Sequence, residues 1–156
     1  MSALPATASD PASGADRSIR RILLATDLST ASEGASEQAL QLSRDLRADL
    51  LVVSVIDPAS VLPLGPSSAR MDQRRAAREA VAQAIVVNGV RAGVKVNFLV
   101  WEGEPGPAIV EAAIAEDADL VVVGTHGRSR VGRMVLGSVS DHVVRHAPCP
   151  ILIVRG

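Results

Sequence analysis

The segment from Val121 to Val143 combines residue types that could bind an anion, because glycines follow an apolar run and arginines stand between them. A glycine has no Cβ, so a phosphate could approach the backbone N–H groups near Gly124, Gly127 and Gly132. The start of a following helix would add partial positive charge. A single loop glycine is better explained by a tight turn, but three of them with interleaved arginines favour an anion site. The arginines are Arg128, Arg130 and Arg133.

Two common phosphate-binding motifs do not match this segment. The spacing from Gly127 to Gly132 is that of a Walker A loop, but Arg133 replaces its lysine and Met134 replaces the Ser or Thr that holds magnesium. A dinucleotide-binding fingerprint would follow the first strand, where the chain has "TDLS" instead. The sequence therefore disfavours a Walker A site and a Rossmann dehydrogenase.

Other residues could take part in chemistry or could have only structural roles. Asp27 could accept hydrogen bonds from ribose hydroxyls or could only stabilise a turn. His126 could donate to a phosphate, act as a general acid or base, or be an exposed loop residue. His142 and His146 could form half of a metal site, but no third ligand is evident, so we expect surface histidines and no metal. The single Cys149 lies among apolar residues and is expected to be a small buried hydrophobe.

Five short apolar runs must position these residues. They have strand length and are rich in β-branched residues, at 20–26, 50–56, 94–101, 119–124 and 150–155. The third alternates like an edge strand, whereas the first, second and fourth are nearly continuously apolar, as in parallel strands covered on both faces. Helical patterns lie between the runs. The alternation predicts a three-layer, doubly wound, Rossmann-like α/β domain with a five-stranded, mainly parallel sheet, whose ligand would bind beyond the carboxyl ends of the strands.

The expected helices have recognisable limits. Thr30 and Glu33 predict a capping box before the first helix. The second spans about 69–91 and ends before Gly93, the third begins near Pro107, and the fourth follows the glycines and stops at "APCP". The irregular stretch at 57–68 could be a lid or a mobile loop. The residues expected to face the sheet are Ala35, Ala39, Leu42, Leu46, Val81, Ala84, Ile85, Ile109, Ala113, Leu136, Val139 and Val143.

Composition limits the classes of partner. The chain has 156 residues, 47% of them hydrophobic, but no Tyr and only Phe98 and Trp101 as aromatics, so the core must be aliphatic and nucleobase stacking on aromatics is disfavoured. The charges of the 16 basic and 17 acidic residues nearly cancel, which favours neither nucleic acid nor an anionic membrane as a partner.

Residues 1–17, rich in Ala, Ser and Pro, are expected to be a disordered tail rather than a signal peptide, and residues 18–156 are expected to form one domain. No apolar run has a membrane-spanning length, so we expect a cytoplasmic protein.

The glycine segment resembles the nucleotide-binding signature of the universal stress protein family. It has Gly124, two further residues, Gly127, nine further residues, and then Gly137 followed by Ser138. The resemblance covers the chain after the tail, since "ILLATDLS", "VVSVID" and "HAPCPILIVR" are similar to the family's first strand with its acidic turn, its second strand and its closing element.

The resemblance implies a site for ATP, with or without magnesium, or for another adenine nucleotide. Asp27 and Val55 would flank adenine and ribose, and the glycines with "GSVS" would hold ribose and phosphates through N–H and hydroxyl groups. The resemblance also implies that the fourth helix begins at "GSVS", later than the apolar pattern indicates. Ser138 could be a phosphate ligand or only a helix cap. The expected nucleotide-binding residues are Ala25, Thr26, Asp27, Val55, Gly124, Thr125, His126, Gly127, Arg128, Gly137, Ser138, Val139 and Ser140.

The sequence thus favours a small cytoplasmic ATP-binding regulatory protein of the stress response. The family often forms homodimers through its final strand, and "PILIVR" fits an apolar edge. The open alternatives are a binder of a cyclic nucleotide, a nucleotide-free dimeric scaffold and a weak ATPase. Efficient catalysis is not favoured, because Asp27 and His126 are the available candidates and form no recognised catalytic pair.

Overall fold

Five parallel strands form one sheet in the computed structural model, which describes residues 18–59, 68–125 and 136–155. The strands are β1 (Arg21–Ala25), β2 (Asp49–Ile56), β3 (Val96–Glu102), β4 (Leu120–Gly124) and β5 (Ile151–Val154). Their order is β3-β2-β1-β4-β5, and all neighbouring pairs are parallel. The predicted doubly wound α/β fold is confirmed, with β3 at an edge as expected, and the strand order reverses between β1 and β4.

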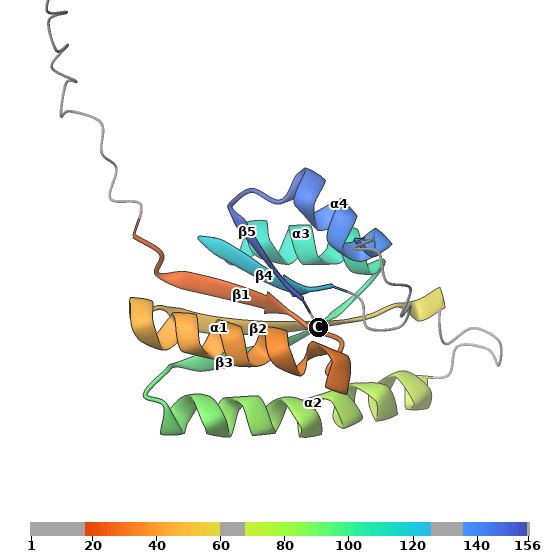
Figure 1. The fold of residues 1–156 in the computed structure, drawn as a ribbon. Coiled ribbons are helices and arrows are strands. Elements are labelled where there is room, and N and C mark those ends of the chain that lie inside the picture. Colours follow the sequence, from red (N-terminus) through yellow and green to blue (C-terminus); the bar gives the residue numbers. More distant parts are fainter. Residues whose placement is uncertain (1–17, 60–67, 126–135, 156) are drawn as a thin grey trace, which may run out of the picture.

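Two helices cover each face of the sheet (Figure 1). On one face lie α1 (Glu33–Leu46) and α2 (Ser68–Arg91), and on the other lie α3 (Pro105–Ala115) and α4 (Ser138–His146). A short 3-10 helix, η1 (Thr30–Ser32), precedes α1. The predicted three layers are therefore present.

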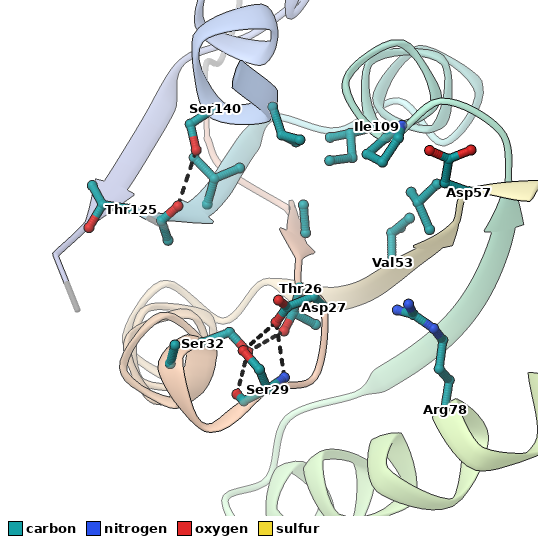
Figure 2. Close-up of a pocket in the computed structure, with 17 residues that line it drawn as sticks. Thr26, Asp27, Ser29, Ser32, Val53, Asp57, Arg78, Ile109, Thr125 and Ser140 are labelled. Atoms are coloured by element: carbon teal, nitrogen blue, oxygen red, sulfur yellow. Dashed lines mark hydrogen bonds between the residues drawn. The ribbon is translucent and has the colours of Figure 1, made fainter. Parts of the chain in front are cut away.

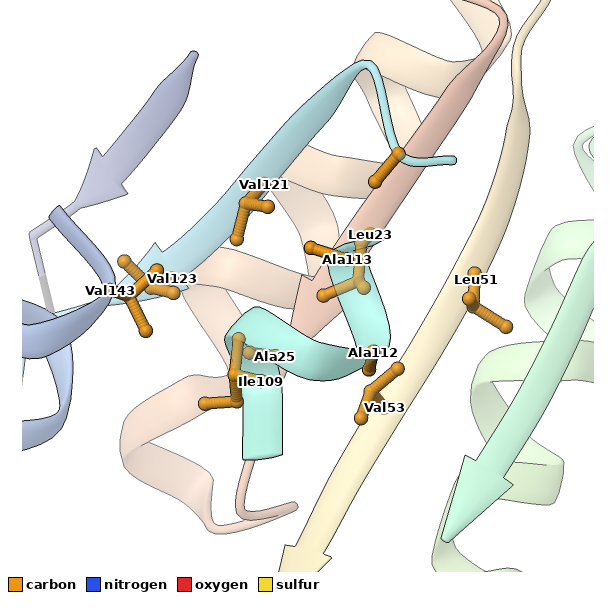
Figure 3. Close-up of a cluster of buried hydrophobic side chains, with 11 residues drawn as sticks. Leu23, Ala25, Leu51, Val53, Ile109, Ala112, Ala113, Val121, Val123 and Val143 are labelled. Atoms are coloured by element: carbon orange, nitrogen blue, oxygen red, sulfur yellow. The ribbon is translucent and has the colours of Figure 1, made fainter. Parts of the chain in front are cut away.

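Alternate residues of the three central strands, β1, β2 and β4, belong to two aliphatic clusters, one under each helical layer. The cluster under α1 and α2 consists of Ile22, Leu24, Ala35, Ala39, Ala48, Leu50, Val52, Val94, Leu120 and Val122. The cluster under α3 and α4 consists of Leu23, Ala25, Leu51, Val53, Ile109, Ala112, Ala113, Ala118, Val121, Val123 and Val143 (Figure 3). Phe98 and Trp101 are only partly buried at the margins, as an aliphatic core requires.

The capping box predicted from Thr30 and Glu33 is wrong. Thr30 lies in η1, and α1 begins at Glu33 with Ser32 as its N-cap residue, whose side chain makes no capping hydrogen bond. The Ser32 hydroxyl donates instead to the carbonyl of Ser29 at 2.7 Å. The chain therefore enters α1 through a 3-10 turn rather than through a reciprocal cap.

Three residues of α1 and α2 that were expected to face the sheet face solvent instead. Leu46 ends α1 with an exposed side chain, and the buried row of that helix passes through Ser43. On α2, Val81 and Ala84 are exposed whereas Ala82 is buried, so this helix is rotated relative to the expected stripe. Apolar residues stand on several sides of α2, and the sequence alone does not show which side rests on the sheet.

Several element limits differ from the expectation by one turn or less. Gly93 ends α2 in the left-handed region, at φ 75°, as predicted. The Val94 N–H closes that turn by donating to the Gly89 carbonyl at 2.8 Å, so β3 begins at Val96 rather than at 94. Proline suits the first helical position, and α3 begins at Pro105, two residues early.

The fourth helix begins where the family resemblance implied, at Ser138, with Gly137 as its N-cap residue. Leu136 precedes the helix, so placing it on the helical face was wrong. The helix ends at His146, before the prolines, as expected. Cys149 was expected to be buried, but it is half-buried against the cluster under α3 and α4.

Some sequence expectations fall on residues outside the described ranges. These include the tail at 1–17, most of the stretch at 57–68 and the glycine- and arginine-containing segment at 126–135. In the described ranges, none of the helices combines the length and the apolar character needed to cross a bilayer.

Candidate functional site

A cavity of about 320 Å³ opens at the carboxyl ends of β1, β2 and β4, where the strand order reverses (Figure 2). This is the position at which open α/β sheets bind ligands, and the volume lies in the range of small-molecule sites. The described residues that line it are Ala25, Thr26, Asp27, Ser29, Ala31, Ser32, Val53, Val55, Asp57, Arg78, Pro105, Ile109, Val123, Gly124, Thr125, Val139 and Ser140.

Eight of the thirteen expected nucleotide-binding residues line this cavity. They are Ala25, Thr26, Asp27, Val55, Gly124, Thr125, Val139 and Ser140. Gly137 and Ser138 lie at the start of α4, outside the lining. His126, Gly127 and Arg128 fall outside the described residues. The described part of the expected set therefore converges on one region of the fold.

One wall of the cavity is apolar. Val53 and Val55 come from β2, Ile109 comes from α3 and Val139 comes from α4. Val53 and Ile109 belong to the cluster under α3 and α4, and the other two pack against it. The wall is continuous with the core, so its position is fixed by core packing. Such a surface suits the flat, weakly polar face of a nucleobase better than it suits a phosphate.

The turn after β1 forms the polar side of the cavity and is held by its own side chains. The Thr26 hydroxyl donates to Ser32 Oγ at 2.8 Å and accepts from the Leu28 N–H at 3.0 Å. Asp27 Oδ1 accepts from the Ser29 N–H at 2.9 Å and from its hydroxyl at 2.6 Å. Leu28 has φ 61°, a left-handed conformation unusual for leucine, so these bonds maintain a strained turn. Asp27 thus has the turn role and also lines the cavity.

The opposite end of the cavity is formed where β4 meets α4. The Ser140 hydroxyl donates to the Gly124 carbonyl at 3.1 Å and joins the two elements. Gly137 occupies the N-cap position, so the expectation that Ser138 could cap this helix is wrong. The first N–H groups of a helix lack intrahelical partners and attract anions. A Cβ at Gly124 would meet Ala35 Cβ at 3.7 Å, an ordinary contact, so packing does not require glycine there.

Arg78 also lines the cavity, although it was not among the expected site residues. It extends from α2 toward the end of β2 (Figure 2). Its Nη1 donates to Oγ of the fully buried Ser54. Burial lowers the pKa of the Arg78 guanidinium; the charge of Asp27 opposes this shift and that of Arg74 adds to it. The chain has four arginines between positions 70 and 78, and no spacing distinguishes this one.

Other lining residues were also absent from the expected set. Val53, Asp57 and Val123 stand near the ends of predicted strands and could have been found from that position. Pro105 and Ile109 belong to α3, and their place in the cavity depends on how that helix crosses the sheet. Ser29, Ala31 and Ser32 lie in η1 or at its N-cap, and no sequence pattern predicted this 3-10 turn.

The two histidines of α4 stack on each other. The ring centroids of His142 and His146 are 4.2 Å apart, and His146 Nδ1 lies 2.9 Å from the His142 carbonyl oxygen. Among the residues that the structure describes, no group of three His, Cys, Asp or Glu side chains could hold a metal ion. The described site is therefore built from hydroxyl, carboxylate, guanidinium and aliphatic groups.

Comparisons with known proteins agree with this architecture. The model of the universal stress protein family matches residues 18–155. The universal stress protein in the QAH/OAS sulfhydrylase 3′ region of Thermus aquaticus is 38% identical over 138 residues, covering 87% of this chain and 98% of that protein. A universal stress protein solved in complex with cAMP has a TM-score of 0.65 at 27% identity, covering 88% of this chain and 97% of that one. The universal stress protein UspA of Lactobacillus plantarum has a TM-score of 0.76 at 25% identity, with coverages of 88% and 98%. On this sequence and structural agreement, the chain belongs to the universal stress protein family.

Proposed function

We propose that this protein is a cytoplasmic ATP-binding regulatory protein of the stress response, with the nucleotide in the cavity at the ends of β1, β2 and β4. The observation that carries the proposal is the composition of that cavity, which joins an aliphatic wall to a polar rim at the point where strand order reverses. A relative solved with bound cAMP supports an adenine nucleotide as the ligand.

The nucleotide would lie along the cavity with its base against Val53 and Val55 and its ribose beside Asp27. Its phosphates would extend toward Ser140 and the start of α4, where the first N–H groups of the helix can donate. Gly124, Gly127 and the other glycines of the signature would allow the phosphates to approach the backbone. This orientation places the most polar part of the ligand away from Val53 and Val55.

The relative in complex with cAMP favours a second candidate, a cyclic nucleotide. ATP carries more negative charge and needs more donors than cAMP does. The arginines and glycines between positions 126 and 135 provide such donors in the sequence, which favours ATP.

Calorimetric titration of protein purified free of nucleotide tests this function. ATP, ADP, AMP and cAMP are titrated with and without magnesium, and phosphate release is followed in parallel to detect slow hydrolysis. We expect ATP to bind most tightly. Absence of binding for all four ligands would leave the nucleotide-free scaffold as the function, and a clear preference for cAMP would support the second candidate.

A substitution pair tests whether the described cavity is the binding site. Val55→Glu introduces a carboxylate into the aliphatic wall and should weaken ATP binding by at least about tenfold. Val144→Glu makes the same change at an exposed position on α4 outside the lining and should bind ATP like the unmodified protein. Circular dichroism melting checks that both variants are folded. Equal affinity in Val55→Glu and the unmodified protein would place the nucleotide elsewhere.

The same proposal includes a homodimer formed through β5. This strand is at the edge of the sheet and pairs with β4, and all four of its side chains are apolar and partly exposed. An unpaired apolar edge strand offers its N–H and C=O groups to another strand. Pairing with a second copy would cover that edge.

A further inference from the structure

Arg78 brings a positive charge to one end of the cavity from a helix that contributes no other residue to its described lining. A guanidinium has five N–H donors in a plane, and the Ser54 hydroxyl accepts from Nη1. Figure 2 shows the side chain extending from α2 toward the end of β2, on the same side of the cavity as Asp57. The guanidinium is thus anchored on a buried hydroxyl and directed at the cavity.

The charges beside Arg78 indicate what kind of group it can face. Asp27 and Asp57 line the same cavity; burial lowers the Arg78 pKa, and the charge of Asp27 acts in the opposite direction. Arg74 is close enough to act on Arg78 electrostatically but does not line the cavity. A phosphate at this end would be repelled by two lining carboxylates and attracted by only one lining guanidinium. An uncharged hydrogen-bond acceptor would not be repelled in this way.

The other end of the cavity has the opposite character. There the first N–H groups of α4 lack intrahelical partners and can donate, and none of the described lining residues at that end is acidic. The two ends therefore favour one orientation of the ligand. Its phosphates would lie at the end formed by β4 and α4, and an uncharged group would lie at the Arg78 end.

We propose that Arg78 recognises the base, its guanidinium donating a hydrogen bond to a ring nitrogen of adenine. This inference rests on the proposed function and adds a specificity residue to it. Adenine presents ring-nitrogen acceptors beside an exocyclic amine that donates. A guanidinium in a cavity also lined by two carboxylates presents a donor together with acceptors, which matches that pattern.

Arg78→Met tests the inference, because methionine keeps much of the side-chain length and removes the charge and the donors. The matched control is Arg75→Met on the same helix, since Arg75 pairs with Glu102 at 2.9 Å and does not line the cavity. ATP, adenosine and inorganic tripolyphosphate are titrated into each protein. Arg78→Met should bind ATP and adenosine about tenfold more weakly and tripolyphosphate unchanged, whereas Arg75→Met should match the unmodified protein for all three.

Deaza-adenosines separate a base contact from a merely structural role. One of the 1-, 3- and 7-deaza compounds should bind the unmodified protein more weakly than adenosine does, and Arg78→Met should abolish that difference. A difference that persists in Arg78→Met, or an equal loss of affinity for tripolyphosphate, would overturn the base contact. Unchanged ATP affinity in Arg78→Met would overturn it while leaving the proposed function intact. Absence of nucleotide binding by the unmodified protein would overturn both.

Discussion

Two buried serines differ in whether their hydroxyls are paired. Ser54 is fully buried and accepts a hydrogen bond from Arg78, whereas Ser43 on α1 is 1% exposed and its hydroxyl has no partner among the described residues. A buried polar group without a partner costs stability, and removing it relieves that cost.

We therefore expect opposite results from the same substitution at these two sites. Ser43→Ala should leave the free energy of unfolding unchanged or raise it by up to about 1 kcal/mol. Ser54→Ala should lower it by about 1 to 2 kcal/mol, because it leaves a partly buried guanidinium donor unpaired. Urea denaturation of both variants measures the difference. A larger loss for Ser43→Ala than for Ser54→Ala would contradict this account.

At the residue scale, the sequence could identify site residues that directly follow a strand. Asp27 and Gly124 were found because strand ends converge in a parallel sheet. Arg78 could not be found this way, because its place in the cavity depends on the rotation of α2 and on which arginine reaches Ser54. The rotation of α2 was itself wrongly predicted, as the exposed Val81 shows.

At the element scale, glycine sets how closely α2 approaches the sheet. A Cβ built at Gly89 would lie 2.1 Å from Val96 Cγ2 and 3.3 Å from Val96 Cβ. Valine is branched at Cβ and cannot turn away easily. The contact between α2 and β3 therefore depends on the absence of a side chain at this position.

Gly89→Ala should lower the free energy of unfolding by about 1 to 3 kcal/mol, since the helix or the strand must move. Gly34→Ala is the matched control, because Gly34 also lies in a helix, α1, and a Cβ added there would meet no atom within 4 Å. The control should be neutral or stabilising by up to about 1 kcal/mol through helix propensity. Thermal and urea unfolding compare the two, and equal effects would mean that Gly89 is not a packing position.

The elements themselves could be predicted because their apolar patterns have the required periods. All five strands and all four α-helices of the described chain occur near the expected places. Apart from the rotation of α2, the errors concern the ends of the elements, where local hydrogen bonds determine the conformation. The Ser32 hydroxyl bonds to the Ser29 carbonyl rather than completing a capping box, and Val94 closes the turn after α2 instead of starting β3.

At the scale of the whole molecule, β5 determines whether two copies can join. The N–H groups of Val121 in β4 and of Thr125 just after it donate to the carbonyls of Pro150 and Val154. Because main-chain groups alternate along a parallel strand, Ile151 and Ile153 direct theirs toward the open edge. A strand from a second copy would bond to those groups.

Ile153→Pro removes one outward N–H group and should leave the ladder to β4 intact. We expect the unmodified protein to sediment as a dimer and this variant to sediment as a monomer at the same concentration. Circular dichroism melting checks that the variant is folded. A monomeric unmodified protein, or a folded variant that remains dimeric, would show that β5 does not form the interface.

The central position of β1 also matters while the chain is being made. β1 lies between β2 and β4, and β4 begins only at Leu120. On the ribosome, one side of this apolar strand therefore has no native neighbour until most of the chain has been translated. A nascent chain that stalls before that point exposes an apolar strand edge, which is the kind of surface that aggregates or engages chaperones.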